Sequence, residues 1–109
     1  MSYSIILSDN FKKEAKKLLK KYASLERELS EIGSLLEENP TAGISIGNGV
    51  FKIRLSIKSK NKGKSGGGRV VYFVKVVGEI VYLLSIFDKA DKANISDKEI
   101  ELIMKSEGI

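Results

Sequence analysis

The chain has 109 residues, the length of one domain (residues 1–109), and it contains neither cysteine nor histidine. These absences exclude disulfides, thiolate metal sites and histidine acid–base chemistry, and they fit a reducing cytoplasm. The formal net charge of +5 is concentrated, because residues 52–69, KIRLSIKSKNKGKSGGGR, hold seven Lys or Arg and no acid. We call this stretch the basic block. Such a local positive potential is typical of a surface that binds polyanions.

The first third of the chain predicts a strand and two helices. Residues 3–7 form a short apolar run that indicates a strand, and Ser8 can cap the helix that follows. Apolar residues then recur at helical spacing twice, in residues 11–22 and 25–36, until Asn39 and Pro40 end the second helix. We expect the two helices to form a hairpin. The six lysines of the first helix favour a solvated face over an RNA track.

The middle of the chain predicts one strand with two different faces. Residues 41–49 are rich in glycine, and Asn48 with Gly49 indicates a turn before a strand over residues 50–57. Successive side chains of a strand point to opposite faces. The core face is then expected to hold Phe51, Ile53, Leu55 and Ile57, and the outer face Lys52, Arg54 and Ser56.

The remaining elements complete an α+β domain. Residues 58–68 read as a basic loop, residues 69–77 and 80–87 as a β-hairpin turning at Gly78 and Glu79, and Ser96 with Glu99 as a capping box that opens a last helix through residue 104. The order is β-α-α-β-β-β-α. We predict a small antiparallel sheet, an N-terminal helical hairpin on one face and a short C-terminal helix.

The segments FKIRL, GKSGGGRVVYF, IVYLLSIFDKAD and NISDKEI, in this order, resemble the RelE/HigB branch of bacterial toxins from toxin–antitoxin pairs. The resemblance is most specific over residues 63–72. It implies a ribosome-dependent endoribonuclease that cuts messenger RNA, blocks translation and is silenced by a cognate antitoxin. It also implies that RNA binds on the open side of the sheet. The cleavage residues of such toxins correspond here to Lys52, Arg54, Arg69 and Lys89.

The chemistry of RNA cleavage can be assigned to these cations without a metal or a cofactor. The reaction needs a base for the ribose 2′-hydroxyl, cations for the phosphorane and an acid for the leaving oxygen. We expect neighbouring cations to lower the pKa of Lys52 enough for it to act as the base, with Arg54 and Arg69 clamping the phosphate. Lys89 is expected to be a clamp or a proton donor, and Tyr82 is the other candidate donor.

Further residues are expected to contact RNA. They are Lys58, Lys60, Lys62, Lys64 and Ser65 of the basic block, together with Tyr82 and Phe87. Phe87, at a strand end, is a candidate for stacking on a base, whereas Tyr72 shares its strand face with Val70 and Val74 and is expected in the core. Asp88 and Asp91 are expected to end a strand and cap a turn rather than bind a metal.

Two other functions stay open from the sequence. One is a ParE-like toxin that acts on DNA gyrase, which shares the architecture and does not need a phosphate-clamping face. The other is a basic RNA-binding or ribosome-associated module without catalysis. In all cases we expect a cytoplasmic protein with no membrane partner, because no apolar run approaches the length of a membrane span. A cognate antitoxin is expected to be acidic and partly disordered, covering the basic face or displacing the last helix.

Overall fold

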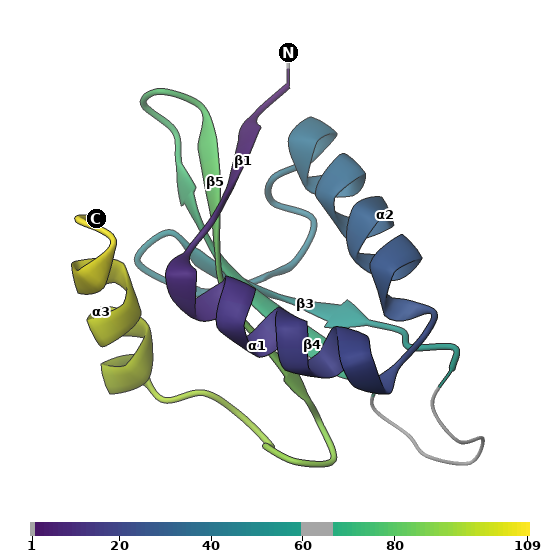
Figure 1. Cartoon of the computed structure of the whole chain (residues 1–109). Coiled ribbons are helices and arrows are strands. Elements are labelled where there is room, and N and C mark those ends of the chain that lie inside the picture. The colour runs from purple at the N-terminus through teal and green to yellow at the C-terminus, as the bar shows by residue number, and fades with distance from the viewer. Residues whose placement is uncertain (1, 60–66) are drawn as a thin grey trace.

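The computed structural model describes residues 2–59 and 67–109, so the predictions for Lys60, Lys62, Lys64 and Ser65 lie outside the described residues. Over the described residues the chain forms three helices and a five-stranded sheet (Figure 1). Their order is β1 (Ser4–Leu7), α1 (Asp9–Lys21), α2 (Leu25–Glu38), β2 (Ile44–Gly47), β3 (Val50–Leu55), β4 (Gly68–Lys75), β5 (Ile80–Asp88) and α3 (Asp97–Ser106). The predicted α+β class is confirmed. None of the helices within these ranges is long and apolar enough to cross a membrane.

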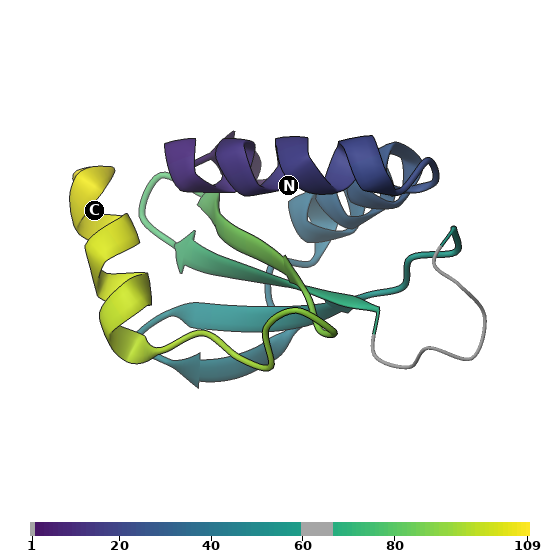
Figure 2. The ribbon, with the colours of Figure 1, turned by 60° about the horizontal axis from the view of Figure 1, so that its bottom comes forward.

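The sheet separates two apolar clusters. Helices α1 and α2 cover one face, and α3 packs against the opposite face near one end of the sheet (Figure 2). Leu55 and Tyr72 belong to the cluster under α1 and α2, whereas Val71 and Ile100 belong to the cluster beside α3. The alternation predicted for residues 50–57 is therefore confirmed, because Phe51, Ile53, Leu55 and Ile57 all contact the first cluster.

The strand order is β1-β5-β4-β3-β2, with β1 parallel to β5 and the other neighbours antiparallel. The sheet is thus mixed, where the sequence predicted antiparallel pairing. Strand β2 was also missed, because its ISIG sequence is short and lies among turn residues. It forms by pairing with β3 across the predicted turn, in which Asn48 and Gly49 both have positive φ, 56° and 79°. Strands β3 and β4 end at Leu55 and Lys75, each two residues earlier than predicted.

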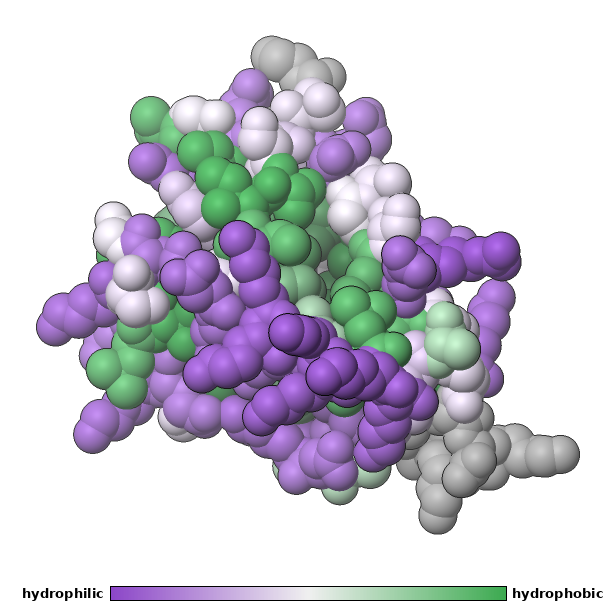
Figure 3. Space-filling model, in the orientation of Figure 1, coloured by the Kyte–Doolittle hydropathy of each residue, from purple (hydrophilic) through white to green (hydrophobic). Residues whose placement is uncertain are grey.

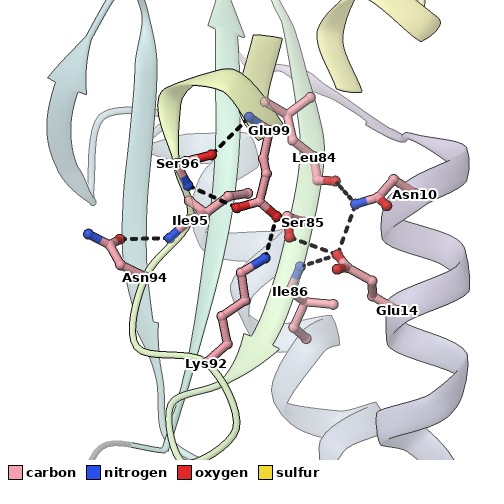
Figure 4. Close-up of polar contacts among 10 residues, drawn as sticks. All are labelled: Asn10, Glu14, Leu84, Ser85, Ile86, Lys92, Asn94, Ile95, Ser96 and Glu99. Atoms are coloured by element: carbon pink, nitrogen blue, oxygen red, sulfur yellow. Dashed lines mark hydrogen bonds and ion pairs between the residues drawn. The ribbon is translucent and has the colours of Figure 1, made fainter. Parts of the chain in front are cut away.

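Helix α1 begins where β1 ends, and its side chains bond the part of β5 that β1 does not reach. Pairing of β1 with β5 stops at Leu7, and β5 continues past it as far as Asp88. Ser8 caps α1 and donates from Oγ to the carbonyl of Leu84 over 3.1 Å. Glu14 then accepts from the Ser85 hydroxyl at 2.7 Å and from the backbone N–H of Ile86 at 3.2 Å (Figure 4). Side chains of α1 thus satisfy backbone groups of β5 that a further strand would otherwise bond.

The predicted capping box of the last helix is confirmed. Ser96 Oγ accepts from the N–H of Glu99, and the Glu99 carboxylate accepts from the N–H of Ser96, both over 3.1 Å (Figure 4). Lys92 adds an ion pair to Glu99 at 2.7 Å, and this bond lowers the pKa of the Glu99 carboxyl. The start of α3 is therefore held by local contacts that the sequence contains.

Candidate nucleic-acid interface

Strands β3, β4 and β5 place basic residues in adjacent positions on one face. Arg54 of β3 lies directly opposite Arg69 of β4, which in turn lies opposite Phe87 of β5. Lys52 precedes Arg54 by two residues, so it points to the same face at a spacing of roughly 7 Å. This face is the one turned away from α1 and α2, because the intervening residues Ile53 and Val70 contact the cluster under those helices.

The segment after β5 adds a fourth cation to this face. Lys89 donates from Nζ to the carbonyl of Ala93 over 2.9 Å, and Lys52 donates from Nζ to Asn94 Oδ1 over 3.0 Å. Two consecutive residues therefore hold both lysines, which come from distant parts of the chain. We call Lys52, Arg54, Arg69 and Lys89 the cationic face. An ammonium group has three donors, so each lysine keeps two for a phosphate.

Asn94 is a contact that sequence reasoning missed. Its Oδ1 also accepts from the N–H of Ile95 over 2.9 Å, which fixes the side chain against its own backbone (Figure 4). No spacing or composition signal marks this asparagine, because the contact to Lys52 spans 42 positions of the chain.

Gly67 joins the end of the basic block to Lys89. Its carbonyl accepts the N–H of Lys89 over 3.0 Å, and its φ is +47°. A Cβ at this position would lie 2.3 Å from the carbonyl oxygen of Leu55, so the close approach of β3 requires glycine. Gly67 is therefore required where the chain enters β4.

Asp88 organises the turn that carries Lys89, and its predicted role in ending the strand is confirmed. Its side chain is 2% exposed, and Oδ1 accepts the N–H of Ala90 over 2.9 Å. Oδ2 accepts the hydroxyl of Tyr22 over 2.5 Å. This hydrogen bond, with burial, raises the pKa of the Tyr22 phenol. The backbone carbonyl of Asp88 accepts two further N–H groups, from Asp91 and Lys92.

Lys58, at the start of the predicted loop, is exposed, and its backbone is fixed by α2. Its N–H donates to Glu28 Oε2 over 2.8 Å, and Glu28 is 6% exposed. The side chain of Lys58 is therefore accessible while its main chain is held against the helices.

The aromatic residues predicted to contact RNA have packing contacts in the structure. Phe87 is 5% exposed, belongs to the cluster beside α3 and lies with its ring 5.6 Å from Lys92 Nζ. Tyr82 lies roughly 15 Å along β5 from Phe87 and packs 6.3 Å from the ring of Phe73. The structure therefore does not bring Tyr82 to the cationic face. Tyr72 is fully buried and accepts the N–H of Gly43 over 3.0 Å, so its predicted core position is confirmed.

The other side of the molecule has an apolar groove. Helices α1 and α2 diverge from their junction, and a groove of about 640 Å³ lies between them and β1. Ile5, Leu7, Leu19 and Leu29 are among the residues that line it, and Lys12, Lys16 and Lys20 of α1 form one rim. Figure 3 shows this apolar surface bordered by the hydrophilic surface of α1. An apolar floor beside a row of cations suits an amphipathic segment that carries acidic residues.

Comparisons with known proteins identify the fold of this chain. Two solved structures of the toxin RelE from E. coli, both of a double mutant, cover 100% of this chain with a TM-score of 0.62. One is the free toxin, at 17% identity over 100% of its own chain, and the other is a complex with an antitoxin RelBc peptide, at 20% identity over 96%. They show that the fold is that of this toxin.

The family follows from the sequence. Residues 5–107 match the family described as the RelE toxin of the RelE / RelB toxin–antitoxin system, so the chain belongs to the RelE toxin family. A search of curated proteins found no match.

Proposed function

We propose that this protein is a ribosome-dependent endoribonuclease that cuts messenger RNA and thereby inhibits translation in the cytoplasm. The observation that carries the proposal is the cationic face, in which Arg54 and Arg69 lie directly opposite each other on neighbouring strands. Arg69 donates from Nη1 to the carbonyl of Gly68 over 2.9 Å, and a phosphate bound beside the two opposed arginines would offset their mutual repulsion. Membership of the RelE toxin family supports a toxin that acts with an antitoxin.

The cleavage step assigns a role to each cation. Lys52 acts here as a neutral amine, whose Nζ keeps its hydrogen bond to Asn94 and takes the proton of the ribose 2′-hydroxyl. The 2′-oxygen then attacks the adjacent phosphorus. Arg54 and Arg69 bind the phosphate oxygens and stabilise the added negative charge as the phosphorane forms. The 5′-oxygen leaves with a proton from Lys89, which the turn after β5 places on the same face, and a cyclic phosphate remains on the other fragment. Tyr82 is the poorer donor, because it lies at the other end of β5.

The proposed partner is an acidic, partly disordered antitoxin. The lysine rim of the groove between α1 and α2 complements an amphipathic helix with acidic residues beside its apolar face. We place that helix of the antitoxin in the groove, and we place a second segment on the cationic face or at α3, where it would exclude RNA. The antitoxin peptide bound to the toxin RelE of E. coli supports a peptide partner of this kind.

The experiment is cleavage of a defined message in a reconstituted translation system. Mapped 5′ ends should appear with the wild-type protein, only when ribosomes translate, and they should disappear with Arg54→Ala and with Arg69→Ala. Lys17→Ala, on the exposed side of α1, is the matched control and should cut normally. Growth arrest with DNA damage and intact transcripts would instead identify a gyrase-directed toxin. Ribosome binding without any cut would identify a non-catalytic module.

A further inference from the structure

The connection between α1 and α2 touches both segments that flank the cationic face. We infer that this connection and the first turn of α2, residues 22–28, form a positioning element for the RNA-contacting lysines, and that Tyr22 and Glu28 are its two anchors. Tyr22 holds the turn that carries Lys89, and Glu28 holds the main chain at Lys58. The inference rests on the proposed function, because it assigns the two anchors to the placement of residues that act on RNA.

The first anchor is the hydrogen bond between Tyr22 and Asp88. Tyr22 is the C-cap residue of α1, is 8% exposed and donates its hydroxyl to Asp88 Oδ2 over 2.5 Å. The other oxygen of that carboxylate accepts the N–H of Ala90, so one side chain connects the helix to both sides of Lys89. Lys89 is then fixed in turn by its own N–H, which donates to Gly67. The C-cap residue of α1 therefore anchors the turn through which Lys89 leaves β5.

The second anchor is a set of four hydrogen bonds at the start of α2. Glu28 accepts the N–H of Lys58 at 2.8 Å and the hydroxyl of Ser24 at 3.1 Å. Ser24 and Ser59 then bond each other's backbone, with Ser59 N–H to Ser24 Oγ at 3.0 Å and Ser24 N–H to Ser59 Oγ at 3.2 Å. Three of these four contacts join residues 30 or 35 positions apart in sequence. They fix where the basic block leaves the sheet.

The two anchors converge because the connection lies at the end of the sheet where β3 and β5 both finish. A cation on a rigid strand, such as Arg54, needs no such support, whereas Lys58 and Lys89 lie just beyond their strands and depend on what holds their backbone. A displacement of about 1 Å in a catalytic group can reduce a rate by up to about 100-fold. Loss of the Tyr22 hydroxyl should therefore reduce the rate of cleavage without removing any cation.

The first test is Tyr22→Phe, with Tyr72→Phe as the matched control. Each variant loses one buried, hydrogen-bonded hydroxyl, but Tyr72 bonds Gly43, which is not part of the turn after β5. Hydrogen exchange should show faster exchange at Ala90 and Lys89 in Tyr22→Phe and unchanged exchange there in Tyr72→Phe. In the translation system, kcat for cleavage should fall about tenfold in Tyr22→Phe while KM for ribosomes stays near the wild-type value. Equal kcat in Tyr22→Phe and wild type would overturn the inference.

A double-mutant cycle separates positioning from a general structural effect. If Tyr22 acts through Lys89, Tyr22→Phe should cause no further loss of kcat in a Lys89→Ala background, and it should cause its full loss in an Arg54→Lys background, which keeps the charge that binds the phosphate. Equal losses in both backgrounds would refute the positioning role of Tyr22. A wild-type protein that cuts no message would refute the proposed function, and it would refute the positioning role of Tyr22 as well.

The second anchor is tested by rescue. Glu28→Gln keeps a carbonyl oxygen that can accept the N–H of Lys58, whereas Glu28→Ala removes the acceptor. We expect Glu28→Ala to raise KM for ribosomes through misplacement of Lys58, and Glu28→Gln to restore most of the affinity. If both variants bind and cut as the wild type does, Glu28 has no part in positioning.

Discussion

The number of phosphates that the cationic face holds can be measured from the salt dependence of RNA binding. The face presents four cations, from β3, β4 and the turn after β5. Each phosphate contact with a single strand contributes about −0.7 to the slope of log affinity against log salt, so four contacts give about −3. Between about 50 and 200 mM salt the affinity of the wild-type protein should then fall roughly 50-fold.

Removing one cation should change that slope by a fixed amount. For Arg54→Ala the slope should become less steep, about −2, and the loss of affinity over the same salt range should shrink to roughly 20-fold. The assay is fluorescence anisotropy with a labelled RNA oligonucleotide whose reactive 2′-hydroxyl is replaced by hydrogen, which prevents cleavage. Lys17→Ala controls for net charge, because Lys17 is an exposed lysine of α1 on the other side of the sheet. Equal changes of slope in the two variants would show that RNA binding depends on the overall charge of the protein, and would refute the assignment of the cationic face as the RNA-binding site.

Three further outcomes concern stability. Glu14→Ala should lower the free energy of unfolding in urea by about 1–3 kcal/mol, since Ser85 and Ile86 lose a partly buried acceptor. Glu14→Gln should lose less, and equal losses would contradict the role of that acceptor. Stability should fall as the pH rises above 10.0, because the pKa of Tyr22 and of Tyr72 is raised in the folded protein and the unfolded chain loses these protons first. The double variant Tyr22→Phe, Tyr72→Phe should show a weaker dependence of stability on pH in this range. Ser96→Ala should cost about 1 kcal/mol and speed hydrogen exchange in α3 without changing α1.

Features that depend on local sequence could be predicted. The period of two in residues 50–57 fixes which side chains leave the core, so the direction of Lys52 and Arg54 follows from the pattern alone. The cap at Ser8 and the capping box at Ser96 likewise depend on residues at most three positions apart. These predictions needed no knowledge of how the strands pair.

Contacts between distant segments could not be predicted, and they determine the rest of the site. Asn94 contacts Lys52 across 42 positions of sequence, and Tyr22 contacts Asp88 across 66. Strand pairing and helix packing bring these residues together. The burial of Phe87, which was expected to be available for stacking at a strand end, has the same cause. Its environment is set by α3 and by Lys92, which come later in the chain. Strand β2 was missed because its pairing with β3, rather than its composition, makes it a strand.

The opposed arginines allow function and stability to be separated. Arg54 and Arg69 face each other across β3 and β4, and like charges directly opposite each other destabilise a sheet. Arg54→Gln removes the repulsion and keeps a long polar side chain, so at low salt it should unfold at a higher urea concentration than the wild type. Arg54→Lys keeps the charge and should not gain stability. Since Arg54 contributes to RNA binding in this account, Arg54→Gln should be more stable and inactive, as expected where a site is maintained at a cost in stability. Loss of both stability and activity would mean that Arg54 supports the sheet rather than the substrate.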